Sequence, residues 1–332
     1  MIRRLLATIE PYVLMLLATV LIATLLPPRG VGVRVFDLAA DTAIVALFFV
    51  HGAKLSRSAL LAGARHWRLH AAILATSFVL FPLLGLAIAG SGLPSPSLAT
   101  GLLFLTLLPS TVQSSIAFTA IARGNVAAAV CSASLSNLLG IAVTPALAAL
   151  LLPGTGGVEL SFDSVRAIVL QLLVPFAAGH MLRPWIGAWI AARKRLVTTL
   201  DRGSILLVVY TAFGAAVTQG LWSQVGALEL AELVGWCALL LTVVLVLTGV
   251  MARAMKLAPE DAVVMRFCGS KKSLATGVPM AGVLFPPAQV GVVLLPVMVF
   301  HQLQLIACAF LARRLADAVE VEPAMPGAVA SG

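Results

Sequence analysis

The chain has 332 residues, of which 61% are hydrophobic and 11% are charged. A typical soluble domain is about 45–50% apolar and about 25% charged, so the composition excludes an ordinary water-soluble enzyme and predicts an integral membrane protein. The net charge of +9 does not indicate a nucleic-acid partner, because the Lys and Arg residues stand in short runs between apolar stretches instead of on one basic face.

Long apolar runs separated by polar or Pro/Gly-rich breaks predict ten membrane-spanning helices. A span takes about 20 residues, so ten spans use nearly the whole chain and leave no sizeable domain outside the bilayer. The first run follows Arg3 and Arg4, as in a signal peptide, but Glu10 and Pro11 interrupt that pattern. No convincing cleavage site follows, which predicts an uncleaved span. The predicted spans are 12–27, 35–53, 69–90, 98–121, 125–152, 164–187, 201–221, 230–252, 260–285 and 288–312.

The loop charges test this count, because a wrong number of spans would scramble their alternation. With the N-terminus inside, most Lys and Arg residues fall on the cytoplasmic side, and only Arg29, Arg34 and Arg166 lie outside. The pattern predicts an inner-membrane protein with both termini cytoplasmic. Its segments are a cytoplasmic N-terminus 1–11, a five-span half 12–152, an extracytoplasmic loop 153–163, a second half 164–312 and a cytoplasmic, disordered tail 313–332. Because five is odd, a repeated half would enter the membrane from the opposite side, which predicts an inverted repeat, an architecture typical of secondary transporters.

The fourth span contains a polar break. Pro109 removes a backbone donor in mid-span, and the hydroxyls of Ser110, Thr111, Ser114 and Ser115 around Gln113 compete for backbone groups. Non-helical backbone at this depth is tolerated only where it is buried in protein or lines a wet cavity. The segment is therefore either a broken helix or a simple proline kink.

The ninth span carries Arg266, Lys271 and Lys272 beside Gly269, Ser270 and Ser273. A charge at the bilayer centre costs at least about 2.5–3.5 kcal/mol, and Lys271 and Lys272 stand too far from the span ends to reach water. No carboxylate is an obvious counter-ion. The lysines then meet the carbonyls of broken helices, bind an anionic substrate or are uncharged part of the time.

Spans five and ten add further polar groups, either for helix packing through hydrogen bonds or for a cavity wall. In span five these are Ser132, Ser134, Ser136 and Asn137; in span ten they are His301, Gln302 and Gln304. His301 is either a packed, hydrogen-bonded histidine or a proton relay. The four cysteines fall in apolar stretches without metal-type spacing and are interpreted as small buried hydrophobic residues.

These motifs resemble the bile acid:sodium symporter superfamily, and more narrowly its bile acid symporter-like (SBF-like) branch. The resemblance covers roughly residues 5–315 and depends mainly on Leu108–Ser115 and Phe267–Leu274. It implies two inverted repeats of five spans, a panel domain of the first, second, sixth and seventh spans, and a core domain in which broken helices four and nine cross.

The resemblance also shows a departure from the sodium-coupled members. Their first crossing region reads Pro-Gly-Gly-x-x-Ser-Asn and their second Glu-x-Gly-x-Gln-Asn. Here Ser114 is kept, Ser115 replaces the asparagine, Phe267 replaces the glutamate and two lysines replace the amides. We expect a lysine ammonium to fill the space of a cation, with the coupling ion left open between proton and sodium. The residual sodium ligands are Ser114, Ser115 and Ser132.

The sequence thus predicts a secondary transporter of a small organic anion that works by alternating access and needs no cofactor. The alternative, from distant eukaryotic relatives linked to control of calcium influx, is a membrane regulator without transport of its own. An intramembrane enzyme is not expected, because no catalytic motif occurs in a span. Oligomeric state and substrate identity stay open. The candidate site residues are Pro109, Ser110, Thr111, Gln113, Ser114, Ser115, Ser132, Ser136, Asn137, Gly269, Ser270, Lys271, Lys272, Ser273, His301 and Gln302.

Overall fold

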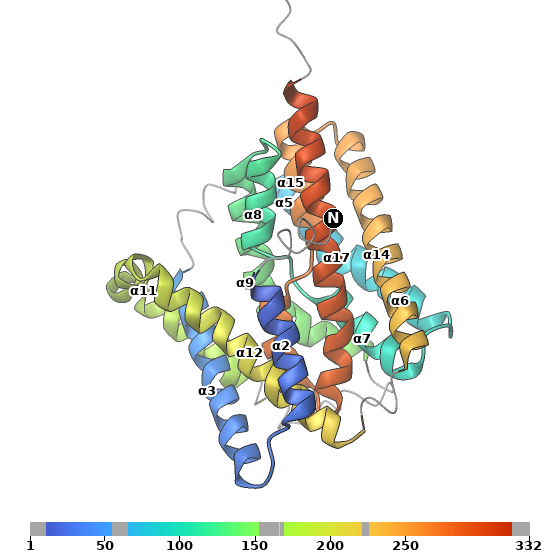
Figure 1. Ribbon diagram of the computed structural model, residues 1–332. Helices are drawn as coiled ribbons and strands as arrows, with labels where there is room; N and C mark the ends of the chain where they lie inside the picture. The colour runs from blue at the N-terminus through green and yellow to red at the C-terminus, as the bar shows by residue number, and fades with distance from the viewer. Residues whose placement is uncertain (1–10, 55–65, 153–165, 167–168, 221–225, 321–332) are drawn as a thin grey trace, which may run out of the picture.

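The computed structural model describes residues 11–54, 66–152, 166, 169–220 and 226–320, and every element named within them is a helix (Figure 1). The all-helical prediction is therefore confirmed for the described residues. The predicted N-terminal segment up to residue 10, the loop 153–163 and the tail residues 321–332 lie outside them.

The helices form two groups, which we name the panel group and the core group. In the panel group, α11 packs along α3, and α12 contacts both α2 and α3. The same α12 also contacts α16 (Leu274–Leu284) and α17 (Pro287–Glu320) and so joins the two groups. The panel group consists of α2 (Pro11–Leu25), α3 (Val31–Lys54), η3 (Val169–Leu173) with α11 (Val174–Ala192), and α12 (Lys194–Thr218).

The core group contains the other described helices, and α17 contacts α7, α8, α14 and α16 within it. In Figure 1 the panel helices lie at the lower left, and the core group lies above them and to their right. Its elements are α5 (Trp67–Ala75), η2 (Thr76–Leu80), α6 (Phe81–Gly90), α7 (Pro96–Leu107), α8 (Gln113–Ile121), α9 (Val126–Leu151), α14 (Ala227–Ala254), α15 (Pro259–Gly269), α16 (Leu274–Leu284) and α17 (Pro287–Glu320).

Five of the described helices are long and apolar enough to cross a membrane: Trp67–Gly90, Val126–Leu151, Lys194–Thr218, Ala227–Ala254 and Gln289–Asp317. One boundary differs from the prediction, because α17 continues to Glu320, whereas disorder was expected from residue 313. The apolar face of this helix extends beyond the predicted span. Ala312 is buried and Leu315 partly buried in a cluster with Val263 and Phe267.

The helix breaks predicted in spans four and nine are both present. Helix α7 ends at Leu107 and α8 begins at Gln113, while α15 ends at Gly269 and α16 begins at Leu274. The interpretation of the cysteines is also confirmed, since Cys131, Cys237, Cys268 and Cys308 are all buried and free.

Two glycines allow the close crossing of α3 and α11. A Cβ atom on Gly52 would lie 2.0 Å from the carbonyl oxygen of Phe176, and one on Gly179 would lie 1.9 Å from that of Phe49. Small residues at such crossings let helix backbones approach closely. The position of α11 on the panel group therefore depends on glycine at both places.

We expect Gly179→Ala to destabilise the protein by about 3 kcal/mol or more, because the new methyl group meets backbone that cannot rotate away. The thermal midpoint in detergent should fall by roughly 5–10 °C. Gly235→Ala in α14 is the matched control, since nothing lies within 4 Å of the position that its new Cβ atom would take. A Gly179→Ala protein that melts with the control would contradict the close crossing.

Candidate functional site

The two helix breaks contact each other directly. The backbone N–H of Ser273 donates to the carbonyl of Pro109 (2.8 Å), and Ser110 Oγ donates to the carbonyl of Cys268 (2.6 Å). Ser115 Oγ donates to the carbonyl of Phe267 at 3.1 Å. Residues of each break thus satisfy backbone groups of the other, as non-helical backbone in an apolar environment requires.

Helix α9 satisfies most of the remaining groups of the first break. Ser136 Oγ accepts from the N–H of Ser110 (2.9 Å), and Asn137 Nδ2 donates to the Ser110 carbonyl (2.7 Å). Thr144 Oγ1 donates to the Leu107 carbonyl (2.8 Å). The polar residues of span five therefore hold the break, and Asn137 also lines a cavity described below.

Lys272 is fully buried and links the first break to the third predicted span. Its Nζ atom donates hydrogen bonds to the carbonyl oxygens of Ser77 (2.8 Å), Thr106 (2.7 Å) and Leu108 (2.6 Å). An ammonium group has three donors, so all three are used. The Phe81 ring centroid lies 4.1 Å from the same nitrogen. Lys272 therefore meets the carbonyls of broken helices, one of the partners expected for the two lysines.

Local sequence explains why these carbonyls are available. Residues Thr76–Leu80 form a π-helical turn in which the N–H of Phe81 donates to the carbonyl of Thr76. The next donor in that register would be Pro82, which has no N–H, so the Ser77 carbonyl lacks a helical partner. The Thr106 carbonyl also lacks a helical partner, because the N–H of Ser110, four residues later, donates to Ser136.

Gln304 of α17 holds the backbone of the second break. Its Oε1 atom accepts from the N–H of Lys272 and its Nε2 atom donates to the Lys272 carbonyl, both at 2.9 Å. The same amide nitrogen lies 2.9 Å from His301 Nδ1. Because an amide nitrogen only donates, His301 Nδ1 accepts, which makes His301 a hydrogen-bonded histidine on the cavity wall. The sequence-based candidate Gln302 is not among the described residues that line the cavity.

Lys271 has a different environment from its neighbour. It is fully buried, and its Nζ atom has no hydrogen-bond partner among the described residues. The nitrogen lies 3.9 Å from the Phe118 ring centroid and 5.6 Å from that of Phe267. Neither Lys271 nor Lys272 lines the cavity, but Phe118 does, so its ring lies against both Lys271 and the cavity.

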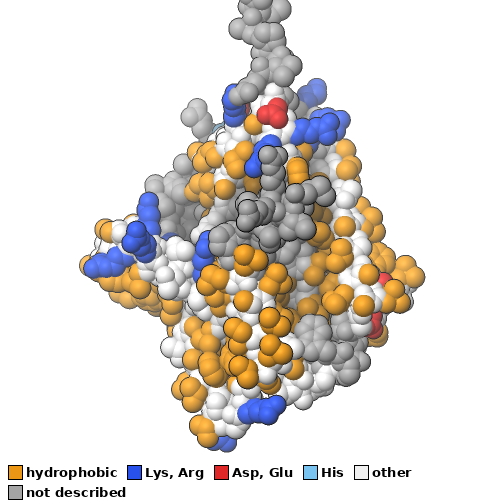
Figure 2. Space-filling view, viewed as in Figure 1, with side chains coloured by type: hydrophobic (Ala, Val, Ile, Leu, Met, Phe, Trp, Pro, Cys, Tyr) orange, Lys and Arg blue, Asp and Glu red, His pale blue; other side chains and the backbone are white. Residues whose placement is uncertain are grey.

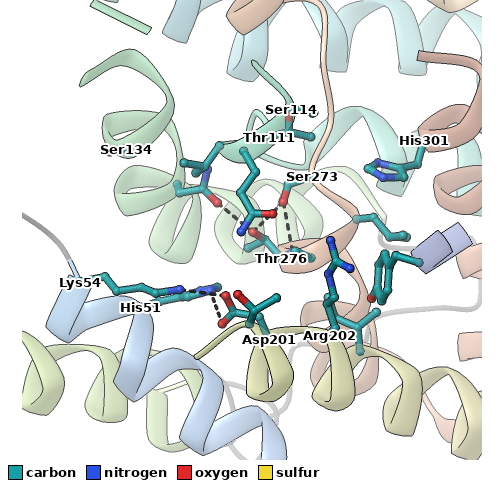
Figure 3. Close-up of a pocket in the computed structure, with 18 of the residues that line it drawn as sticks. His51, Lys54, Thr111, Ser114, Ser134, Asp201, Arg202, Ser273, Thr276 and His301 are labelled. Atoms are coloured by element: carbon teal, nitrogen blue, oxygen red, sulfur yellow. Dashed lines mark hydrogen bonds and ion pairs between the residues drawn. The ribbon is translucent and has the colours of Figure 1, made fainter. Parts of the chain in front are cut away.

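A cavity of about 550 Å³ lies between the panel and core groups (Figure 3). Polar side chains from both breaks and from α9 and α17 line its core side. Thr276 Oγ1 donates to Asn137 Oδ1 (2.8 Å) and lies 2.9 Å from Ser273 Oγ, which ties the second break to α9. The sequence-based candidates on this wall are Thr111, Gln113, Ser114, Asn137, Ser273 and His301.

Charged residues line the panel side of the cavity. Asp201 of α12 pairs with Lys54 Nζ at 2.8 Å and with His51 Nε2 at 3.4 Å, and Arg202 lies beside it (Figure 3). The guanidinium carbon of Arg202 is 5.1 Å from the Tyr12 ring centroid. Sequence reasoning missed this wall because Lys54 and Arg202 were counted as loop charges, and no local motif joins α3 to α12.

The other candidates are placed as follows. Ser114 and Ser115 both hydrogen-bond to Thr111 Oγ1, at 2.8 and 2.9 Å. Ser132, the third residual sodium ligand, instead meets His70 Nδ1 at 2.7 Å. Ser270 Oγ donates to the carbonyl of Arg266. A Cβ atom on Gly269 would lie 3.1 Å from Thr248.

A family model and several known proteins match this chain over most of its length. The family model described as the SBF-like CPA transporter family matches residues 10–317. An uncharacterized protein of Pseudomonas aeruginosa is 56% identical over 309 residues, 92% of this chain and 93% of that one. "Putative symporter YfeH" of Escherichia coli is 49% identical over 310 residues, 92% of each chain. Sodium/bile acid cotransporter 7 of Rattus norvegicus is 26% identical over 80% of this chain and 79% of its own.

Proposed function

Because the chain belongs to the SBF-like CPA transporter family, we propose that it is a secondary active transporter that moves a small organic anion by alternating access. Its relatives carry the names of symporters and cotransporters, not of enzymes. Family and apolar helices together make it a multi-pass membrane protein. The proposal places it in the inner membrane with both termini cytoplasmic.

The proposed architecture is ten spans in two inverted repeats of five. Its support is the matching position of the two breaks, each in the fourth span of its half and each in contact with the other. The panel group contains the first, second, sixth and seventh predicted spans, as the family resemblance implies. Relative movement of the two groups would open the cavity between them to either side in turn.

The charge of the cavity lining is the observation that supports an anionic substrate. Its described lining contains the cations Lys54 and Arg202 but only one carboxylate, Asp201, which Lys54 already pairs. On the core side, hydroxyl and amide groups from the breaks offer hydrogen bonds to a carboxylate, sulfonate or phosphate. Aromatic and aliphatic lining residues, including Phe48 and Phe176, suit an apolar body.

We assign Lys272 the role of a built-in cation. Three carbonyl dipoles converge on its ammonium, and carbonyl oxygens are also the ligands that hard metal cations prefer. A sodium ion at this position would meet a fixed positive charge. The proposal therefore predicts that sodium does not bind there, in contrast to the sodium-coupled members of the superfamily.

Lys271 is the proposed site of proton coupling, because its ammonium can lose a proton without giving up a hydrogen bond in the described structure. Phe118, a cavity residue, lies against this nitrogen, and we propose that displacement of its ring opens Lys271 to water or substrate. We expect Lys271→Met to keep anion binding but lose anion accumulation driven by a pH gradient in liposomes. Lys256→Met, at an exposed position, is the matched control. Accumulation retained by Lys271→Met would exclude this assignment.

A thermal-shift screen tests the function itself. Purified protein is heated with a panel of organic anions, with and without sodium and at two pH values, because a ligand of the native state raises the melting temperature. A selected anion should stabilise the protein equally with and without sodium. Stabilisation that requires sodium, or no stabilisation by any anion, would contradict the proposal.

Flux in liposomes separates transport from the alternative function. A regulator of calcium influx that moves no solute would bind partners without carrying the selected anion across the bilayer. The transporter should load liposomes that contain only this protein. The cavity between two helix groups favours the transporter.

A further inference from the structure

A second cavity, of about 440 Å³, opens on the panel group away from the substrate cavity. We name it the outer groove. It lies between α3, α11 and α12, and its lining is entirely apolar. Residues that define it are Phe49, Val50, Leu182, Trp185, Trp189 and Leu196. Trp185 is 75% exposed and Trp189 51% exposed, so two large aromatic side chains border a groove that no described part of the chain fills.

Three consecutive cations stand beside this groove. Arg193 connects α11 to α12, Lys194 and Arg195 are the first residues of α12, and all three are exposed. The guanidinium carbon of Arg193 lies 4.1 Å from the Trp189 ring centroid, which places one charge on the groove wall itself. Within the described residues, none of the three forms an ion pair. Figure 2 shows Lys and Arg side chains next to apolar ones at the end of α11.

We propose that the outer groove binds an anionic glycerophospholipid, with one acyl chain in the groove and the phosphate group at Arg193, Lys194 and Arg195. The apolar wall matches the chain, and guanidinium groups match the phosphate geometrically and electrostatically. Tryptophan belongs at the boundary between headgroups and hydrocarbon. Basic pockets between helices on the cytoplasmic side bind acidic headgroups, and loop charges place this connection on that side.

Topology alone would explain three cations at a cytoplasmic helix connection, but not the position of Arg193 against Trp189 on the wall of an apolar groove. A zwitterionic lipid offers the same acyl chain without the net charge that these residues complement. The charge therefore selects an anionic lipid over a neutral one.

The site also has a structural consequence for α12. Leu196 and Leu200 face the outer groove, whereas Thr198, Asp201 and Arg202 of the same helix line the substrate cavity. A lipid in the groove would support the wall that carries the cavity's charges. This inference stands independently of the proposed transport function, because it requires no particular solute.

The test measures phosphatidylglycerol binding to the full chain in nanodiscs or detergent, by native mass spectrometry and by thermal shift. We expect phosphatidylglycerol to raise the melting temperature more than phosphatidylcholine. Arg193→Gln with Arg195→Gln should weaken phosphatidylglycerol binding roughly 30-fold, as about 1 kcal/mol for each cation near the membrane implies. The matched control is Arg313→Gln with Arg314→Gln, two exposed cations at the end of α17.

A further variant tests the groove itself. Leu182→Trp should fill it and reduce phosphatidylglycerol retention while leaving the three cations in place. Equal losses of phosphatidylglycerol binding in the two double variants would show general attraction to surface charge and overturn the proposal. So would a thermal shift from glycerol phosphate alone equal to that from the lipid, or unchanged lipid retention in Leu182→Trp.

Discussion

Lys272→Met is expected to lower the melting temperature by roughly 5–10 °C and to reduce the yield of folded protein. The substitution removes the donor to three buried carbonyl oxygens, those of Ser77, Thr106 and Leu108. Each unpaired carbonyl costs about 1–3 kcal/mol, so the loss is about 3 kcal/mol at least, and this size of protein converts it to several degrees. Thermal unfolding in detergent measures the effect.

Lys271→Met is the control, since it removes an identical side chain one residue away. Lys271 donates no hydrogen bond among the described residues, so its replacement should change the melting temperature little. The comparison separates the loss of hydrogen bonds from the loss of a buried charge. A Lys272→Met protein as stable as Lys271→Met would refute the role of Lys272 as the cation that holds the break.

The cavity charges predict opposite effects of two neighbouring substitutions. Arg202→Gln should weaken binding of the anion selected by the screen roughly tenfold, because a cation within several Å contributes about 1–2 kcal/mol at an intermediate dielectric. Asp201→Asn should strengthen binding, since it removes the carboxylate paired with Lys54 and His51. Isothermal titration of each variant with the same anion gives the two affinities.

The opposite directions of the two affinity changes distinguish a charge effect from a structural one. A general disturbance of α12 would weaken binding in both variants, and a melting curve for each would reveal it. Weakening in both variants without a stability change would exclude an anionic substrate at this wall. Raising ionic strength should reduce the difference between them, because salt screens charges that are open to solvent.

The helix breaks were predictable because their chemistry is local. Pro109 lacks an N–H group, and hydroxyl residues beside it offer alternative partners, so the sequence indicates where α7 must end. Lys271 and Lys272 within an apolar span likewise mark a functional or structural exception. Sequence could not assign their different roles, because Lys272 meets carbonyls more than 160 residues away from it in the chain.

The cavity wall of the panel group was not predictable from the same reasoning. Lys54 and Arg202 fit the loop-charge pattern, and Asp201 stands at the edge of a predicted span. The sequence therefore gives each of them an ordinary explanation. Their pairing depends on the packing of α3 against α12. Gln304 was noted as a polar residue of span ten but not counted among the site candidates, since an amide in an apolar span does not indicate which backbone it will hold.

By itself the sequence determined the all-helical membrane class, the places where two helices break and the presence of buried cations, since each follows from hydrophobicity or backbone chemistry over a few residues. Tertiary structure alone decided which carbonyls surround Lys272, that Lys271 lacks a hydrogen-bond partner among the described residues, and which charges line the cavity. Those properties depend on distances between atoms of different helices. Hydropathy specifies that helices enter the bilayer, whereas packing of side chains and small residues specifies which helices meet.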